Sequence, residues 1–245
     1  FDGERNFLEV ENSRKPGFFE IGENGCSIFL VANIAEQSKK NIMREVNGGF
    51  TYRSQIISKG ITGKNISGGQ RTSGEFDLSV VNRAPLGKDI NSMAWSNDAH
   101  EVVSDSGFVQ TGELQIYSFT TFSNPSTSLS QQGGFFSNST KYKENKSAGF
   151  KDEQVIGVEY SGDKPIYIGG VIGDVGAEIG VGTGLNLSAD IFEIIIISGE
   201  VGEYTKDTLE GYLAHKYNLV HKLPQNHRFK ELAPSLESGS SELIS

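Results

Sequence analysis

The 245-residue sequence contains a single cysteine, Cys26. One cysteine excludes an internal disulfide bond and any zinc cluster built from cysteines. Cys26 immediately precedes the apolar run Ser27–Val31, so we expect an inert thiol buried in a strand. The near absence of cysteine fits an extracellular protein as well as a cytosolic one, so it does not fix the compartment.

Positive charge is also scarce. Lysine and arginine together number 22 against 31 aspartate and glutamate residues, which gives a net charge of -9 and a pI near 5.0. Nucleic acids and anionic membranes both require clustered cations, so this balance argues against either partner. No run approaches the ~20 apolar residues of a membrane span, and we expect no membrane insertion.

Strand-like segments dominate what remains. Short apolar or alternating runs recur every 8–15 residues, without βαβ alternation and without an internal repeat. This pattern predicts a two-sheet antiparallel sandwich. The predicted strands are Asn6–Val10, Ser27–Asn33, Phe50–Lys59, Gly74–Asn82, Leu114–Phe122, Gln154–Tyr160, Lys164–Gly169, Glu178–Val181 and Ile191–Ile197, with weaker ones at Ala94–Val103 and Gly107–Gln110. The polar stretch Glu36–Gly49 is predicted to be a loop with at most one helical turn.

The chain ends in an organised stretch, Ile191–Pro234. A β-branched run predicts the last core strand. Thr205–Asn218 then predicts one helix capped by Thr205, with Tyr212 and Leu213 in the core. Leu223-Pro224 ends this region, and an extended strap follows. We expect one domain over residues 1–234 and a flexible tail over Ser235–Ser245.

Three pieces of this stretch carry a family resemblance: Ile191-Phe192-Glu193-Ile194-Ile195, then Leu209–Tyr217 (LEGYLAHKY), then Leu223-Pro224 with His227-Arg228-Phe229 and Pro234. Their order and spacing resemble the closing segment of concanavalin A-like, or laminin G-like, jelly-roll domains of bacterial surface, secreted and phage proteins. Phe1-Asp2-Gly3 is similar to the opening phrase of such domains. The resemblance implies an all-β fold, a two-sheet antiparallel jelly-roll sandwich with one short C-terminal helix.

Catalytic patterns are incomplete. Enzymes on the resembled fold that cleave β-glucans carry three alternating carboxylates on one strand, two of which flank the sugar bond. Glu75-Phe76-Asp77 supplies two, and the third is missing. The sequence lacks a nucleophile elbow and a phosphate loop, and its histidines lack metal-site spacing. The resemblance implies structural roles for His215 and His227, with His227 hydrogen-bonding the strap to the body. We predict that the chain is not an enzyme.

Calcium is the metal that the acidic loops favour, because hard cations take several carboxylate and carbonyl oxygens. The candidate ligands are Asp98, Glu101 and Asp105. The alternative is a set of solvated acidic turns, since no segment has EF-hand spacing.

A sugar site needs flat aromatic rings together with amide or carboxylate groups for the hydroxyls. The candidate ligand-binding residues are Trp95, Asn97, Asp98, Phe135, Phe136 and Tyr142. The alternatives are core packing for Trp95, and loop anchoring or a protein interface for Phe135-Phe136.

These observations predict a non-catalytic carbohydrate-binding or adhesion module of a larger extracellular or virion protein, with a cell-surface or extracellular polysaccharide as its ligand. The alternative is a structural or decoration subunit of a phage particle, fibre or surface layer. Its protein contacts would involve Phe135-Phe136 and the tail Ser235–Ser245. A hydrolase with an atypical site would instead depend on Glu75 or Asp77.

Overall fold

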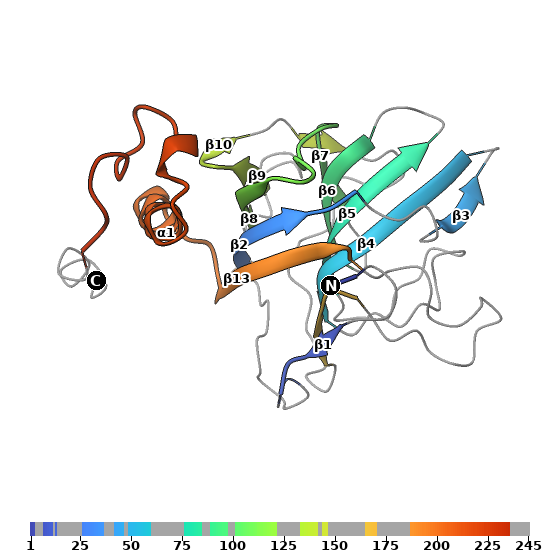
Figure 1. Ribbon diagram of the computed structural model, residues 1–245. Helices are drawn as coiled ribbons and strands as arrows, with labels where there is room; N and C mark the ends of the chain where they lie inside the picture. The colour runs from blue at the N-terminus through green and yellow to red at the C-terminus, as the bar shows by residue number, and fades with distance from the viewer. Residues whose placement is uncertain are drawn as a thin grey trace, which may run out of the picture.

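Two antiparallel β-sheets pack face to face in the computed structural model of this chain, and one helix covers the outside of the smaller sheet (Figure 1). The structure describes residues 1–2, 7–11, 13, 26–36, 42–46, 49–59, 76–84, 89–97, 101–121, 133–141, 144–146, 165–170 and 187–235. The predicted all-β sandwich with a short C-terminal helix is confirmed. The predicted strands Gln154–Tyr160 and Glu178–Val181 lie outside the described residues, as does the tail after Ser235.

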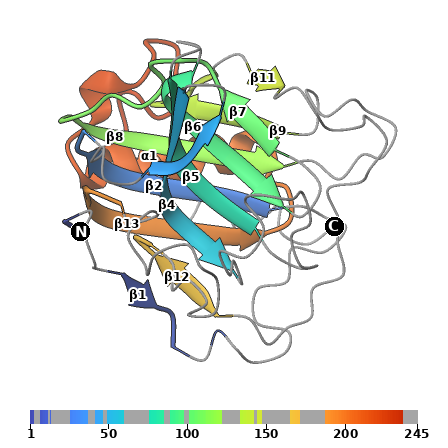
Figure 2. The same ribbon diagram turned by 90° about the vertical axis from the view of Figure 1, so that its right-hand side faces the viewer.

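The larger sheet has eight strands in the order β1-β12-β4-β5-β6-β7-β11, with β3 paired to β4. It faces the viewer in Figure 2. Its strands are β1 (Leu8–Glu9), β3 (Ile42–Val46), β4 (Gly49–Lys59), β5 (Phe76–Ala84), β6 (Asp89–Asn97), β7 (Glu101–Ser104), β11 (Glu144–Lys146) and β12 (Ile166–Ile168).

The smaller sheet has five strands in the order β10-β9-β8-β2-β13. They are β2 (Cys26–Ile34), β8 (Leu114–Thr121), β9 (Gly133–Ser137), β10 (Thr140–Lys141) and β13 (Ala189–Ser198). Of β2, Ile28 and Leu30 enter the core between the sheets, whereas Phe29 and Val31 pack toward the helix. Both faces of β2 are therefore covered, which explains its unbroken apolar run.

Aromatic rings fill the core between the sheets. Trp95 stacks on Phe119 at 5.5 Å between ring centroids, and Phe119 lies 4.6 Å from Phe135. Phe108 contacts Phe135 and Tyr117 from the other side. These five rings are at most 1% exposed, so they form the centre of the sandwich.

A second core lies between the five-stranded sheet and the C-terminal elements, α1 (Glu203–Lys216) and the 3-10 helix η3 (Val220–Lys222). Leu213 and Leu223 pack there against Phe29 and Ile116. None of the described helices is long and apolar enough to cross a membrane.

The helix differs from its prediction at both ends. The helix begins after Gly202, and not after Thr205, which was predicted to cap it. Its first turn, which is acidic, has no side-chain cap. It ends at Lys216, because Asn218 has a left-handed backbone with φ 57°, which ends helices. Tyr212 is 40% exposed and lies outside the core, in contrast to Leu213 at 1%.

Three further predictions differ from the structure. Residues 42–46 form β3 instead of part of a polar loop, because they pair with β4. Ala94–Val103 divides into β6 and β7. Residues 107–110 form a turn, in which Gly107 has φ 78°.

The start of the chain pairs with the start of β13. Asp2 bridges Ser188, and Phe1 exchanges two backbone hydrogen bonds with Ala189, at 2.8 and 3.1 Å. The Phe1 ring lies where a Cβ on Gly169 would be, at 2.3 Å, and Gly169 has φ 82°. Only glycine fits there, for both steric and conformational reasons.

Candidate functional site

Trp95 and Phe135 were predicted to contact a ligand, and the structure corrects this. Both are 0% exposed and belong to the aromatic core. Trp95 lies opposite Leu78 in the ladder, so the alternation of β6 turns it inward. Its indole nitrogen Nε1 is buried without a hydrogen-bond partner. Core packing, the alternative for Trp95, is therefore the observed state.

The other predicted ligand-binding residues are not brought together among the described residues. Phe136 is half-buried, and its ring centroid lies 4.7 Å from Lys206 Nζ of α1. It thus faces the helix. Asn97 is the last residue of β6, and Asp98 and Tyr142 lie outside the described residues.

The calcium candidates lie around β7. Glu101 begins this strand and Asp105 follows its last residue, so their Cα atoms are about 13 Å apart at the usual rise per residue. The Asp105 carbonyl oxygen accepts hydrogen bonds from Ser92 Oγ at 3.2 Å and Ser104 Oγ at 3.3 Å. Asp98 lies outside the described residues, and calcium stays a prediction.

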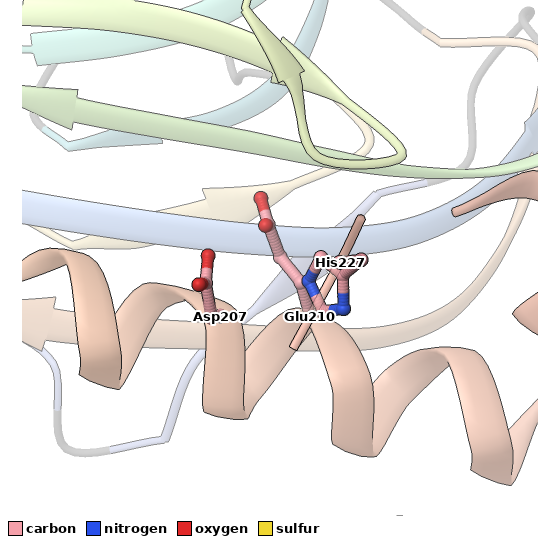
Figure 3. Close-up of side chains that lie close together, drawn as sticks. All are labelled: Asp207, Glu210 and His227. Carbon is pink, nitrogen blue, oxygen red and sulfur yellow. The ribbon is translucent and has the colours of Figure 1, made fainter. Parts of the chain in front are cut away.

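One group of metal-ligating side chains does converge: Asp207 and Glu210 of α1 with His227 of the strap. One ligand atom from each lies within 4.8 Å of the others. Figure 3 shows Asp207 and Glu210 projecting from the same side of α1, with the His227 ring beside Glu210. The strap is the segment His227–Pro234, and it was expected to carry only structural histidines.

Lys206 already occupies the cation position of this group. Its Nζ lies 2.9 Å from Glu210 Oε2 and 3.1 Å from Asp207 Oδ1. Burial alone would lower the pKa of Lys206, but the charges and hydrogen bonds of Glu210 and Asp207 outweigh it and raise that pKa. A fixed ammonium between two carboxylates repels a divalent cation.

The hydrogen bonds of His227 also disfavour a metal. Its Nδ1 accepts a hydrogen bond from Phe229 N at 3.2 Å, so the proton of the neutral ring is assigned to Nε2. Nε2 is buried and has no hydrogen-bond partner. Neither ring nitrogen therefore offers a free lone pair. Burial lowers the pKa of His227, and this keeps the ring neutral.

Glu210 joins the helix to the five-stranded sheet. Its side chain is 0% exposed and accepts hydrogen bonds from Ser118 Oγ of β8, at 2.5 Å, and from Ser139 Oγ. His215 Nε2 bonds the Phe229 carbonyl oxygen at 2.9 Å, so the strap is hydrogen-bonded to the body through His215. We interpret the whole group as a structural network. The i, i+4 pair Lys206–Glu210 was its only signal in the sequence.

A second candidate is the outer face of the eight-stranded sheet, the face turned away from the five-stranded sheet. The ladder places Gln55 opposite Ser79, and Ser58 opposite Asp77. A bulge at Ile56 sends Ile56 and Ile57 into the core and leaves Gln55 and Ser58 on the outer face.

Two polar atoms on this face have no partner. Gln55 is 1% exposed and Ser58 is 0% exposed, and Gln55 Oε1 and Ser58 Oγ make no hydrogen bond. Beside them, Val81, Ala94 and Val103 form a small buried apolar cluster. Periodicity in the sequence could not reveal these residues, because an outer-face serine or glutamine resembles any solvent-facing strand position.

Comparison with known proteins gives similarities in fold only. No family model matches the chain, and no curated protein matches it. Among solved structures it is similar to the NanB sialidase of Streptococcus pneumoniae, with 9% identity over 83% of this chain and 26% of that chain and a TM-score of 0.45.

Two further structures have different sources. Mouse laminin α1 domains LG4-5 match at 11% identity over 82% of this chain and 42% of that chain, with a TM-score of 0.40. Sheep galectin-11 matches at 8% identity over 79% of this chain and 98% of that chain, with a TM-score of 0.33. The chain thus spans about a quarter of the sialidase and under half of the laminin fragment. Identities this low do not indicate function.

Proposed function

We propose that this chain is a non-catalytic carbohydrate-binding module whose ligand contacts the outer face of the eight-stranded sheet. The observation that carries the proposal is the pair of buried atoms without hydrogen-bond partners, Gln55 Oε1 and Ser58 Oγ. A buried polar atom without a partner costs about 1–3 kcal/mol. Such atoms in a folded protein call for an explanation, and a ligand group that completes both of them is the one proposed here.

A sugar supplies what both atoms lack. Gln55 Oε1 accepts only, whereas Ser58 Oγ both donates and accepts, and a sugar hydroxyl can serve either role. Both side chains and the adjacent apolar cluster of Val81, Ala94 and Val103 are at most 1% exposed, so the protein atoms that cover them must move before a ligand contacts them. A hydrogen bond formed there would be shielded from water, where hydrogen bonds are strongest. The apolar cluster would then suit the C–H surface of a pyranose ring.

The proposed ligand is a cell-surface or extracellular polysaccharide, and the proposed setting is a larger extracellular or virion protein. The alternative, a subunit that binds protein, loses one support. It relied on an exposed Phe135-Phe136 pair, and Phe135 is in the core.

The test is a glycan array, run with and without calcium, followed by titration calorimetry on the strongest binder. Gln55→Met keeps the side-chain length and removes the acceptor. We expect it to weaken binding by at least about tenfold, since a neutral hydrogen bond in an enclosed site contributes roughly that factor. The melting temperature should stay the same or rise, because an unpaired buried polar atom has been removed.

Asn33→Leu is the matched control. Asn33 Oδ1 is likewise buried without a partner, but it lies on β2 of the other sheet. This variant should bind as the unmodified chain does. Failure of every glycan to bind in both conditions would contradict the proposal, as would normal binding by Gln55→Met.

A further inference from the structure

β13 is the last strand of the five-stranded sheet, with β2 as its neighbour on one side. Figure 1 shows the N-terminus beside this strand. Phe1 and Asp2 pair antiparallel with Ala189 and Ser188 at its beginning. Among the described residues, no strand other than β2 pairs with residues 190–197. A sheet edge of this kind presents backbone groups that another strand can bind.

The alternation of the ladder decides which backbone groups face this edge. Residues of an antiparallel strand direct their N–H and C=O groups in turn to one side and the other. Ala189 exchanges its bonds with Phe1, so its groups point away from β2. A bulge adds one residue, Phe192, and shifts the alternation by one. The groups that face the edge after the bulge therefore belong to Ile194 and Ile196, and no described residue hydrogen-bonds them from that side.

The side chains of these two residues are less covered than their partners on β2. Ile194 lies opposite Leu30 and Ile196 lies opposite Ile28, and all four face the core between the sheets. Leu30 and Ile28 are 1% exposed, whereas Ile194 and Ile196 are only partly buried. The difference arises because β2 has a strand on both sides. A strand added to the edge of β13 would cover Ile194 and Ile196 with its own inward side chains.

Phe192 adds an exposed apolar contact on the side of the edge that faces α1. It is 52% exposed, and its ring centroid lies 5.9 Å from that of Tyr217. The Tyr217 hydroxyl donates a hydrogen bond to Glu193 Oε2 at 2.9 Å and lies 3.3 Å from the Phe192 carbonyl oxygen. These contacts hold the bulge, so the exposed ring is a preformed seat for one side chain of an added strand.

Acidic side chains flank the edge at both ends. Asp190 is exposed at the beginning of β13, and Glu200 and Glu203 are exposed shortly after its end. The ammonium of Phe1 lies at the Asp190 end. Three carboxylates against one ammonium leave an excess of two negative charges. Lys216 does not change this balance, because it pairs with a glutamate of β13 at 2.8 Å.

This charge pattern distinguishes a second copy of the chain from a different partner. Two copies of β13 paired antiparallel would bring Asp190 of each copy toward Glu200 of the other, and like charges opposite each other destabilise a sheet. Each copy also carries a net charge of -9. A peptide with lysine or arginine at both ends would instead complement the edge.

We infer that the edge of β13 binds an extended peptide segment of a partner protein as an additional strand, antiparallel to β13. The peptide backbone bonds Ile194 and Ile196, its inward side chains are apolar, and basic residues flank it at both ends. Main-chain hydrogen bonds supply affinity in this mode of recognition, and alternate side chains supply specificity. The inference concerns a different sheet from the proposed glycan site and does not rest on it.

Amide hydrogen exchange followed by NMR tests the edge in the free chain. The amides of Ile195 and Ile197 face β2, whereas those of Ile194 and Ile196 face the edge. We expect the edge amides to exchange at least about tenfold faster than the other two. Equal protection of all four would mean that the edge is already covered, and it would overturn the inference.

The probe for binding is the fluorescently labelled peptide acetyl-KKVTVTVKK-amide, titrated by fluorescence anisotropy. Its binding should slow the exchange of the Ile194 and Ile196 amides. The matched peptide EEVTVTVEE should bind at least about tenfold more weakly, because its ends repel the acidic flanks. The first peptide with its valines N-methylated should not bind, because it lacks the donors that face β13.

Two variants locate the bound peptide. Ile196→Pro removes a donor at the edge and keeps the bonds to β2, since proline is tolerated on edge strands. Phe192→Ser removes the exposed ring. Each should weaken peptide binding at least about fivefold. Leu8→Ser is the control, because Leu8 is 59% exposed on β1, the edge strand of the other sheet. Melting curves check that each variant is folded, and glycan binding should be the same in all of them.

Failure of the basic peptide to bind would overturn the inference, as would binding that is unchanged in both Ile196→Pro and Phe192→Ser. Tighter binding of the acidic peptide would overturn the assignment of basic flanks. A dimer in sedimentation that Ile196→Pro dissociates would assign the edge to a second copy and overturn the choice of partner. Loss of glycan binding with normal peptide binding would contradict only the proposed function.

Discussion

Ser118 of β8 donates a 2.5 Å hydrogen bond to Glu210 of α1, across 92 residues of sequence. Glu210 is fully buried and also accepts from Lys206 Nζ at 2.9 Å. The bond fixes the helix to the outer face of the five-stranded sheet. Among the described residues, the one group of metal-ligating side chains, Asp207, Glu210 and His227, therefore stabilises the contact between helix and sheet. Ligand binding is proposed on the other sheet.

Glu210→Gln should destabilise the protein by about 3 kcal/mol. The change leaves the ammonium of Lys206, which is largely buried, without its closest charge partner. Urea unfolding followed by circular dichroism measures the effect. Glu203→Gln, at an exposed position of the same helix, is the control and should cost less than about 1 kcal/mol. Equal effects of the two changes would mean that the buried pair contributes nothing.

Gly211→Ala should destabilise the strap although alanine favours helices. A Cβ on Gly211 would lie 2.6 Å from Phe229 Cβ, so the strap would have to move. We expect a loss of about 1–3 kcal/mol, as for other overpacked sites. Gly202→Ala meets nothing within 4 Å and serves as the control, with an expected loss below about 1 kcal/mol. Limited proteolysis should cut the strap of Gly211→Ala faster, and unchanged cleavage would count against the clash.

Leu213→Ala and Tyr212→Ala should differ clearly in stability. Leu213 is 1% exposed in the second core, so its truncation should cost about 2–5 kcal/mol. Tyr212 is 40% exposed, and its hydroxyl contacts Lys216 Nζ at 2.9 Å on the surface. Its truncation should cost less than about 1.5 kcal/mol. Similar melting temperatures for the two variants would contradict the burial pattern.

The free energy of unfolding should fall as the pH is lowered from about 6.5, which is the ordinary pKa of histidine. Burial lowers the pKa of His227 in the folded protein, so below pH 6.5 the unfolded chain binds a proton that the folded one does not. Because the unfolded state then binds more protons, stability rises with pH over this window. His227→Asn should flatten the dependence between pH 6.5 and the lowered folded pKa.

The exposed His221 supplies the control for this measurement, and His221→Asn should keep the slope. A separate loss is expected at lower pH. Although burial raises the pKa of Glu193, hydrogen bonds from Lys216 and Tyr217 outweigh it and lower that pKa. The stability that Glu193 contributes is therefore present above about pH 4.5, and it is lost as the pH falls through the lowered pKa. A slope at pH 5.5–6.5 that survives in His227→Asn would exclude His227 as its source.

Much of the architecture follows from local patterns. The apolar runs of β2 and β13 predict strands because both faces of each strand pack against an apolar cluster. The closing motif predicts a helix, which is present. The strap that follows was predicted to be extended, whereas residues 225–232 run through turns and bends. Residues 42–46 escaped prediction because their pairing with β4 is a tertiary interaction.

Candidate site residues were harder to find, because exposure is decided by distant parts of the chain. Trp95 followed by polar residues resembles a ligand-binding loop in sequence, yet its place opposite Leu78 puts it in the core. In the sequence, Gln55 and Ser58 resemble ordinary solvent-facing strand positions. Only the structure shows that Gln55 Oε1 and Ser58 Oγ are buried without a hydrogen-bond partner.

The sequence by itself determined the fold class, the presence of a C-terminal helix and the absence of an internal disulfide bond, because these depend on composition and on spacing along the chain. Tertiary structure alone decided which residues meet. Ser118 reaches Glu210 only because α1 packs on β8. Gln55 and Ser79, 24 residues apart in the sequence, become neighbours only through strand register. Register sets spacing across strands at about 5 Å whatever the separation in sequence, and no one-dimensional pattern contains that distance.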